Sequence, residues 1–336
     1  MQLYLHISTP MDNLPLIDNQ NLIKFEAETG GTEGNIPRSF LLPSAVMQET
    51  REMNALFTLI DDPDEEVYST VSEKIVAYGK NIIPNLEHLW ETTLSEEVQE
   101  RIEMIIHHLH YSDLQNDLAE WRDSAYHDLL FGAMLVSKFQ YPDLHTTPVL
   151  QDVEKIRRNI WLELNSFLTP LEQANVLSSI IYNYYNLKGV EISYEHPDDF
   201  FIHKVLESKR GNAITNGILY QVMCDLLDIN AKIISIPKQC IIAFYHSDYD
   251  PATYVGHPQD KIHFYVDATT GQAFSHKDIE NYFKRISVPP TPSYFKPRSH
   301  KRVIQVLLEE LAKCFDKSSN EYKQTELLKL ADLLDL

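Results

Sequence analysis

The residues best suited to chemistry lie in the run 207–220 and in three strands expected after it, at 232–236, 240–245 and 262–267. The run opens a strongly apolar helix that leads directly into the strands. A helix N-terminus beside an antiparallel sheet suits acyl transfer, because the helix end stabilises a cysteine thiolate while two neighbouring strands present a histidine and an acid or amide. The sequence therefore predicts a candidate site where this helix meets the sheet.

The same stretch resembles a known superfamily. Glu207-Ser208-Lys209-Arg210-Gly211-Asn212 with Gly217-Ile218-Leu219-Tyr220, then Ile236-Pro237 and Val266-Asp267-Ala268, is similar to the SirB-type branch of the transglutaminase-like superfamily, and the similarity covers residues 124–290. It implies an α+β fold with a papain/transglutaminase-like core, in which a buried helix packs against an antiparallel sheet. It also implies a helical N-terminal repeat region and a C-terminal helical hairpin.

Two of the three catalytic positions implied by the resemblance hold residues that cannot do the chemistry. The cysteine position falls on Ala213, the histidine position on Gln239, and only Asp267 matches the third position. Glutamine cannot accept and return a proton near neutral pH, and an acid that orients a histidine has little to do without one. If 240–245 pairs antiparallel with 262–267, Gln239 falls beside Asp267. We therefore predict a catalytically degenerate protein that acts as an interaction or regulatory module.

Two alternatives stay open. The first is an acyltransferase or hydrolase with a non-standard site, which uses Thr215 or an unrecognised group and binds substrate through Gln239 and Asp267. The second is a peptide- or carboxylate-binding module that holds an anion at the helix N-terminus, near the backbone of Ile214 and Thr215. The candidate binding residues are Gly211, Asn212, Thr215 and Asn216.

The three cysteines offer no obvious substitute nucleophile. Cys224 lies eleven residues past Ala213 on the same helix, which is roughly 16 Å along its axis. Cys240 follows Gln239 on a strand and should point to the opposite face, into the core. An odd number of scattered cysteines also predicts no disulfide framework and favours a reducing cytoplasm.

Two histidine-rich stretches could hold a metal ion. Glu103, His107, His108 and His110 have helical spacing, and the loop 245–250, continuing through His257 and Asp260, is rich in oxygen and imidazole ligands. Such spacing is common by chance, and the loop lacks the regular pattern of a calcium site. We predict a solvated helix end and an ordinary hairpin loop, and neither a metal ion nor a cofactor.

Charge limits the classes of partner. The chain has 29 basic and 49 acidic residues, for a formal net charge of -20. This charge repels phosphate backbones and anionic membranes, so we predict no nucleic-acid partner and no membrane association. The sequence has no apolar stretch near the roughly 20 residues that span a bilayer. We interpret the acidic stretches at 61–66 and 96–100 as solvated faces. If the helical region binds a protein or peptide, these charges favour a basic partner.

The chain is expected to contain four regions. Residues 1–46 have no helical or strand periodicity, which predicts a mobile tail or a misassigned start, with Met47 or Met53 the true first residue. Helices joined by the acidic turn Asp61-Asp62-Pro63-Asp64 resemble a HEAT-type repeat. The predicted regions are the tail at 1–46, a HEAT-like helical region at 51–123, the transglutaminase-like domain at 124–290 and a helical hairpin at 293–336.

Overall fold

The computed structural model describes residues 44–237, 239–315 and 321–335, and it describes side chains from residue 51 onward. The predicted tail at 1–46 therefore lies almost wholly outside the described residues. The helices and strands from α2 to α12 belong to one compact unit, Ala55–Leu336. None of the helices in these described ranges is long and apolar enough to cross a membrane.

Helices make up the first part of the described chain. They are α1 (Ser44–Thr58), α2 (Glu65–Ala77), α3 (Ile83–Thr92) and α4 (Glu96–Asp123), with 3₁₀ turns at Leu59–Asp61 and Lys80–Ile82. Asp64 and Ser95 accept hydrogen bonds at the N-termini of α2 and α4, which explains where these two helices begin. The expected helical character of 51–123 is therefore observed, and α4 is one continuous helix of 28 residues.

One arginine fastens the acidic turn before α2 to α4. Arg101 donates from its guanidinium to the carbonyl oxygens of Ile60 and Asp62, at 2.9 and 2.6 Å, and pairs with Glu65 at 2.8 Å. Its guanidinium also lies over the ring of Tyr68, 4.6 Å from the centroid. The last carbonyl groups of a helix have no partner within that helix. Here Arg101 of α4 supplies the donor for the carbonyl oxygens of Ile60 and Asp62.

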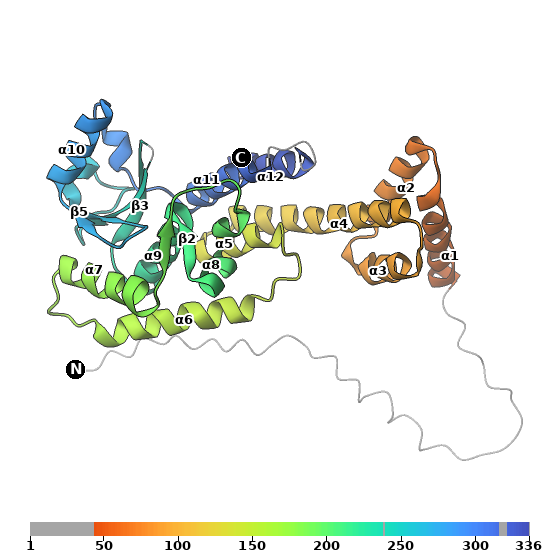
Figure 1. The fold of residues 1–336 in the computed structure, drawn as a ribbon, viewed down its shortest axis with the longest axis horizontal. Coiled ribbons are helices and arrows are strands. Elements are labelled where there is room, and N and C mark those ends of the chain that lie inside the picture. The colour runs from red at the N-terminus through yellow and green to blue at the C-terminus, as the bar shows by residue number, and fades with distance from the viewer. Residues whose placement is uncertain (1–43, 238, 316–320, 336) are drawn as a thin grey trace, which may run out of the picture. The chain divides into compact units, whose positions relative to one another are not determined.

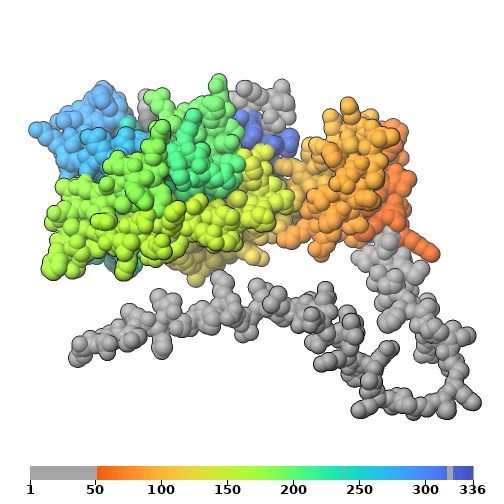
Figure 2. Space-filling view, turned by 60° about the horizontal axis from the view of Figure 1, so that its bottom comes forward, coloured from red at the N-terminus to blue at the C-terminus, as the bar shows by residue number. Residues whose placement is uncertain are grey.

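The next helices surround α9 (Ala213–Leu226). They are α5 (Leu129–Lys138), α6 (Thr146–Glu163), α7 (Pro170–Ser178) and α8 (Ile202–Ser208), and a π-helical turn at Ser179–Tyr184 extends α7. Thr169 and Glu172 form a capping box at the start of α7, as the Thr-Pro-Leu-Glu sequence predicts. Contacts of α5, α6 and α8 with α9 explain why α9 is apolar around most of its circumference (Figure 1). In the space-filling view, α6 and α7 form much of the visible face (Figure 2).

A four-stranded antiparallel sheet covers the remaining side of α9. Its order is β3 (Ala231–Ile236), β4 (Gln239–Tyr245), β5 (Ile262–Asp267) and β6 (Ala273–Phe274). Alternate residues face two separate cores, which explains the nearly continuous apolar runs in the strands. One core includes α9, and the other lies against α10 (His276–Ile286). A buried helix against an antiparallel sheet confirms the predicted α+β class.

A second, smaller sheet and the last helices complete the unit. β1 (Lys188–Val190) and β2 (Arg210–Asn212) pair in parallel. α11 (His300–Ala312) and α12 (Glu321–Leu333) pack against each other, and their apolar side chains belong to the same core as those of α9. Further 3₁₀ turns lie at Pro197–Phe200, Pro258–Lys261, Pro292–Phe295 and Lys313–Phe315.

A group of charged side chains ties α9 to β3 and α11. Asp225 accepts from Lys232 Nζ at 2.5 Å, and His300 Nε2 lies 3.2 Å from its other carboxylate oxygen. His300 Nδ1 donates to the carbonyl oxygen of His127 at 2.6 Å, and the side-chain amide nitrogen of Gln221 lies 2.9 Å from His300 Nε2. Burial alone would raise the pKa of Asp225, but the hydrogen bonds and charges of His300 and Lys232 outweigh it and lower the pKa.

Candidate functional site

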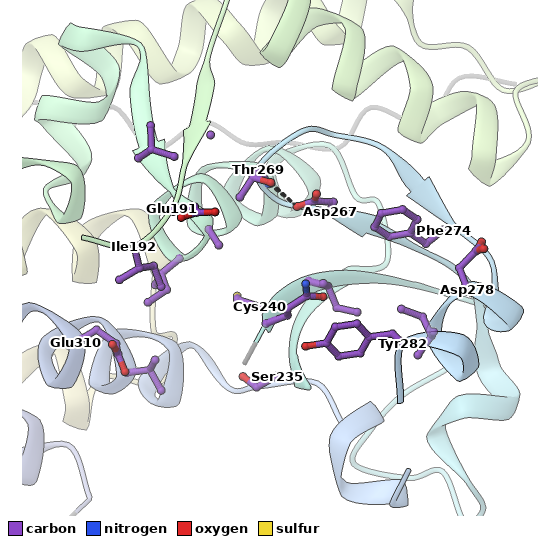
Figure 3. A pocket seen from close by; sticks show the side chains of 18 of the residues that line it. Glu191, Ile192, Ser235, Cys240, Asp267, Thr269, Phe274, Asp278, Tyr282 and Glu310 are labelled. Atoms are coloured by element: carbon purple, nitrogen blue, oxygen red, sulfur yellow. Dashed lines mark hydrogen bonds between the residues drawn. The ribbon is translucent and has the colours of Figure 1, made fainter. Parts of the chain in front are cut away.

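A cavity of about 1020 Å³ lies where the start of α9 meets the sheet. Its walls come from the segment 189–194, the first turn of α9, the β3–β4 hairpin, the turn after β5, α10 and α11 (Figure 3). Ala213, Gln239 and Asp267 all line it. The three positions that the sequence associates with chemistry are therefore brought together in one cavity.

The N-terminus of α9 is capped by its own sequence. Asn212 is fully buried, and its side-chain oxygen accepts from the backbone N–H groups of Ile214 and Thr215 at 2.9 and 3.1 Å. These are the amides at which a carboxylate was expected. An anion could reach them only by displacing Asn212, so the carboxylate-binding alternative loses the free donors that it requires.

The other candidate residues at this helix start are also buried. Thr215 is fully buried, and its hydroxyl donates to the carbonyl oxygen of Asp199 at 2.8 Å. Gly211 packs so closely on Asn216 that a Cβ added at Gly211 would collide with the Asn216 amide oxygen. The described residues that line the cavity include none of Gly211, Asn212, Thr215 and Asn216. The Thr215 hydroxyl is thus out of reach of a substrate in the cavity.

The strand register differs from the one expected. We predicted Gln239 beside Asp267, but β4 pairs Ile241 with Asp267 and β3 pairs Ile236 with Gln239. The expected register was wrong by two residues. β4 begins at Gln239, where it pairs only with β3, and its pairing with β5 begins at Ile241. Gln239 is exposed at the hairpin and still lines the cavity.

The Asp267 carboxylate accepts hydrogen bonds from residues of the turn that follows it. One carboxylate oxygen accepts from the backbone N–H and the hydroxyl of Thr269 at 2.8 and 2.7 Å (Figure 3), and the other accepts from the Thr270 hydroxyl at 3.0 Å. The turn closes with Gly271 in a left-handed conformation. Both oxygens of Asp267 therefore stabilise the turn after β5, which accounts for an acid at this position without a histidine beside it.

Comparison with protein families identifies the part of the chain that holds the cavity. A family model described as the transglutaminase-like superfamily matches residues 147–309. The chain contains a transglutaminase-like domain. The match runs from the first turn of α6 into α11, so it includes α9, the sheet and the cavity. Comparison with curated proteins and with solved structures found no match.

Ala213 supplies only a methyl group to the cavity of the transglutaminase-like domain, and a neighbouring thiol does not replace the missing nucleophile. Cys240 lines the cavity, and its sulfur would lie 3.7 Å from a Cβ added at Gly217 of α9. Burial raises its pKa to about 12, although the charge of Arg298 acts in the opposite direction. Cys240 points toward α9 and packs against its core, as predicted, but it also reaches the cavity wall, which was not expected. Cys224 is fully buried, and burial raises its pKa.

The described lining of the cavity contains no histidine. It does contain several polar groups that sequence reasoning did not single out, because they come from segments far apart in the chain. Glu191 follows β1, Tyr282 and Arg285 lie on α10, and Glu310 lies on α11. No motif connects these residues, so only the tertiary structure could reveal them.

The two histidine-rich stretches lie outside this cavity. His107 Nε2 lies 2.7 Å from a carboxylate oxygen of Glu326 on α12, and Glu103 accepts from the indole of Trp90. The ring of His246, in the loop after β4, stacks on that of His263 of β5 with centroids 3.8 Å apart. Within the described ranges, no group of three or more histidine, cysteine or acidic side chains is arranged to hold a metal ion.

Proposed function

We propose that this transglutaminase-like domain is a catalytically degenerate member of the SirB-type branch that binds a segment of a partner protein in its cavity. One observation carries the proposal: the cavity presents Ala213, Gln239 and an Asp267 engaged in its own turn at the places of the cysteine, the histidine and the acid. A pre-formed cavity of this size suits binding. Acyl transfer additionally needs an activated nucleophile and a base.

The remaining nucleophiles support this assignment. Burial raises the pKa of the Cys240 thiol, which disfavours the thiolate, and the thiolate is the attacking species. The Thr215 hydroxyl is buried under Asp199. An enzyme with a non-standard site therefore receives less support than a binding module, and so does a carboxylate site at the capped helix N-terminus.

The helical region in front of the domain fits an interaction role. We assign α2, α3 and α4 to a HEAT-like region, a type of structure that commonly offers a protein-binding surface. The acidic residues near the starts of α2 and α4 favour a basic partner. We place this interaction or regulatory protein in the cytoplasm, where cysteines such as Cys224 and Cys240 stay reduced.

The purified protein is expected to show no acyl-transfer activity. Incubation with a glutamine-containing peptide and a primary amine, followed by mass spectrometry, should give neither deamidated, cross-linked nor hydrolysed product above the rate without protein. The Cys240→Ser and Asp267→Ala variants should be indistinguishable from the parent in this assay. Time-dependent product that either substitution abolishes would refute the proposal, and loss in Cys240→Ser alone would identify the thiol as a nucleophile.

A further inference from the structure

Negative charge dominates the cavity wall. Four carboxylates line the cavity, from Glu191, Asp267, Asp278 and Glu310, against the single guanidinium of Arg285. Hydrogen bonds from Ser275 lower the pKa of Asp278, so this carboxylate is charged at neutral pH. The side chain of Arg285 is drawn over the ring of Tyr282, 5.3 Å from its centroid.

The four carboxylates differ in whether they already accept hydrogen bonds from the protein. Asp267 accepts from two threonines, Asp278 accepts from Ser275, and Glu310 accepts from the Tyr194 hydroxyl and from Lys313 Nζ at 2.8 and 2.6 Å. Glu191 is exposed and makes no side-chain hydrogen bond or ion pair with any other described residue. It is therefore the acid that can pair with a cation from outside the domain.

The segment that carries Glu191 is also suited to an extended chain. β1 ends at Val190, and the next residues continue along the cavity wall without pairing to another strand (Figure 3). No backbone hydrogen bond joins Glu191 or Ile192 to another described residue. Val190 and Ile192 also line the cavity, so apolar residues precede and follow Glu191 along this segment.

Given the proposed binding function, we infer that the occupant is an extended peptide segment in which lysine or arginine alternates with apolar residues. Its backbone pairs with the free groups of Glu191 and Ile192, as in the addition of a strand to an exposed edge. Its cationic side chain pairs with Glu191, and its apolar side chains lie against Val190 and Ile192. A cavity of about 1020 Å³ has room for a few residues of such a segment.

Fluorescence anisotropy with three labelled peptides of equal length tests this inference. Valine alternates with lysine in the first, with serine in the second and with glutamate in the third. The lysine peptide should bind most tightly and the glutamate peptide most weakly. Glu191→Gln should weaken the lysine peptide about fivefold and leave the serine peptide unchanged, because a partly exposed ion pair contributes up to about 1 kcal/mol.

Glu195→Gln is the matched control, since Glu195 is exposed, lies four residues away and is not among the described lining residues. It should leave all three affinities unchanged. Equal affinity for the lysine and serine peptides would overturn the preference for a basic peptide. If Ala213→Phe then abolished the binding of both peptides, the proposed binding function of the cavity would still hold. Binding of the lysine peptide that is insensitive to both Glu191→Gln and Ala213→Phe would place it outside the cavity and overturn the inference.

Discussion

Replacing Gly189 by alanine is expected to destabilise the domain by about 2–3 kcal/mol and to deform the cavity. A Cβ at Gly189 would lie 2.6 Å from the Cα of Thr269 and closer still to the Thr269 carbonyl oxygen. The obstacle is backbone, which cannot rotate away as a side chain can, so β1 or the turn after β5 must move. Movement of this turn strains the hydrogen bonds between Asp267 and its threonines. Urea unfolding of both proteins measures the difference.

Gly217→Ala is the matched control for this prediction. A Cβ at Gly217 would lie 3.6 Å from the Cβ of Ala268 and 3.7 Å from the sulfur of Cys240, which are ordinary contact distances. Because Gly217 lies inside α9, alanine there should stabilise by about 0.5–1 kcal/mol. Equal midpoints for Gly189→Ala and the parent protein would show that β1 and the turn are not in close contact.

Asp225→Ala is expected to cost about 2–3 kcal/mol of unfolding free energy. The substitution leaves Lys232 and His300 without their carboxylate partner, and all three side chains are at least two-thirds buried. Removing one partner from a buried charged group is costly because the remaining charge stays desolvated. The exposed Glu280 of α10 offers a control, since Glu280→Ala should change stability by less than about 0.5 kcal/mol.

The cost of Asp225→Ala should depend on pH. The pKa of Asp225 is lowered in the folded protein, so its contribution is fully present above the unfolded value of about 4 and is lost as the pH falls through the folded pKa. The difference in unfolding free energy between parent and variant should therefore shrink as the pH falls below about 4. A difference that grows as the pH falls below about 4 would contradict the ion pair between Asp225 and Lys232.

Local sequence signals were sufficient for the elements that build the site. Thr169 and Glu172 mark the start of α7, the apolar run from Ala213 marks α9, and the apolar runs at 232–236, 240–245 and 262–267 mark β3, β4 and β5. These features depend on neighbours in the sequence, so capping and periodicity reveal them. The strand register was harder to predict. Asp267 pairs with Ile241, two residues beyond the expected partner Gln239, and Gln239 pairs only with Ile236 of β3.

The cavity itself could only be predicted in part. Ala213, Gln239 and Asp267 follow from the resemblance, but Glu191 and Glu310 come together through the packing of β1 and α11 around α9. Gln221 and Asp225 of α9 likewise contact a distant residue, His300, which lies 75 or more residues away in the sequence. Contacts between such distant segments leave no local periodicity to read.

The most direct test of a cavity that binds without catalysing is to incubate the protein with a mixed peptide pool, recover the bound peptides and determine their masses. Ala213→Phe fills the cavity wall, and Ala252→Phe makes the same substitution at an exposed loop residue. We predict that the parent and Ala252→Phe retain the same peptides with unchanged masses, and that Ala213→Phe retains none of them. Bound peptides that return deamidated, cross-linked or cleaved, or retention that Ala213→Phe does not reduce, would contradict binding without catalysis in this cavity.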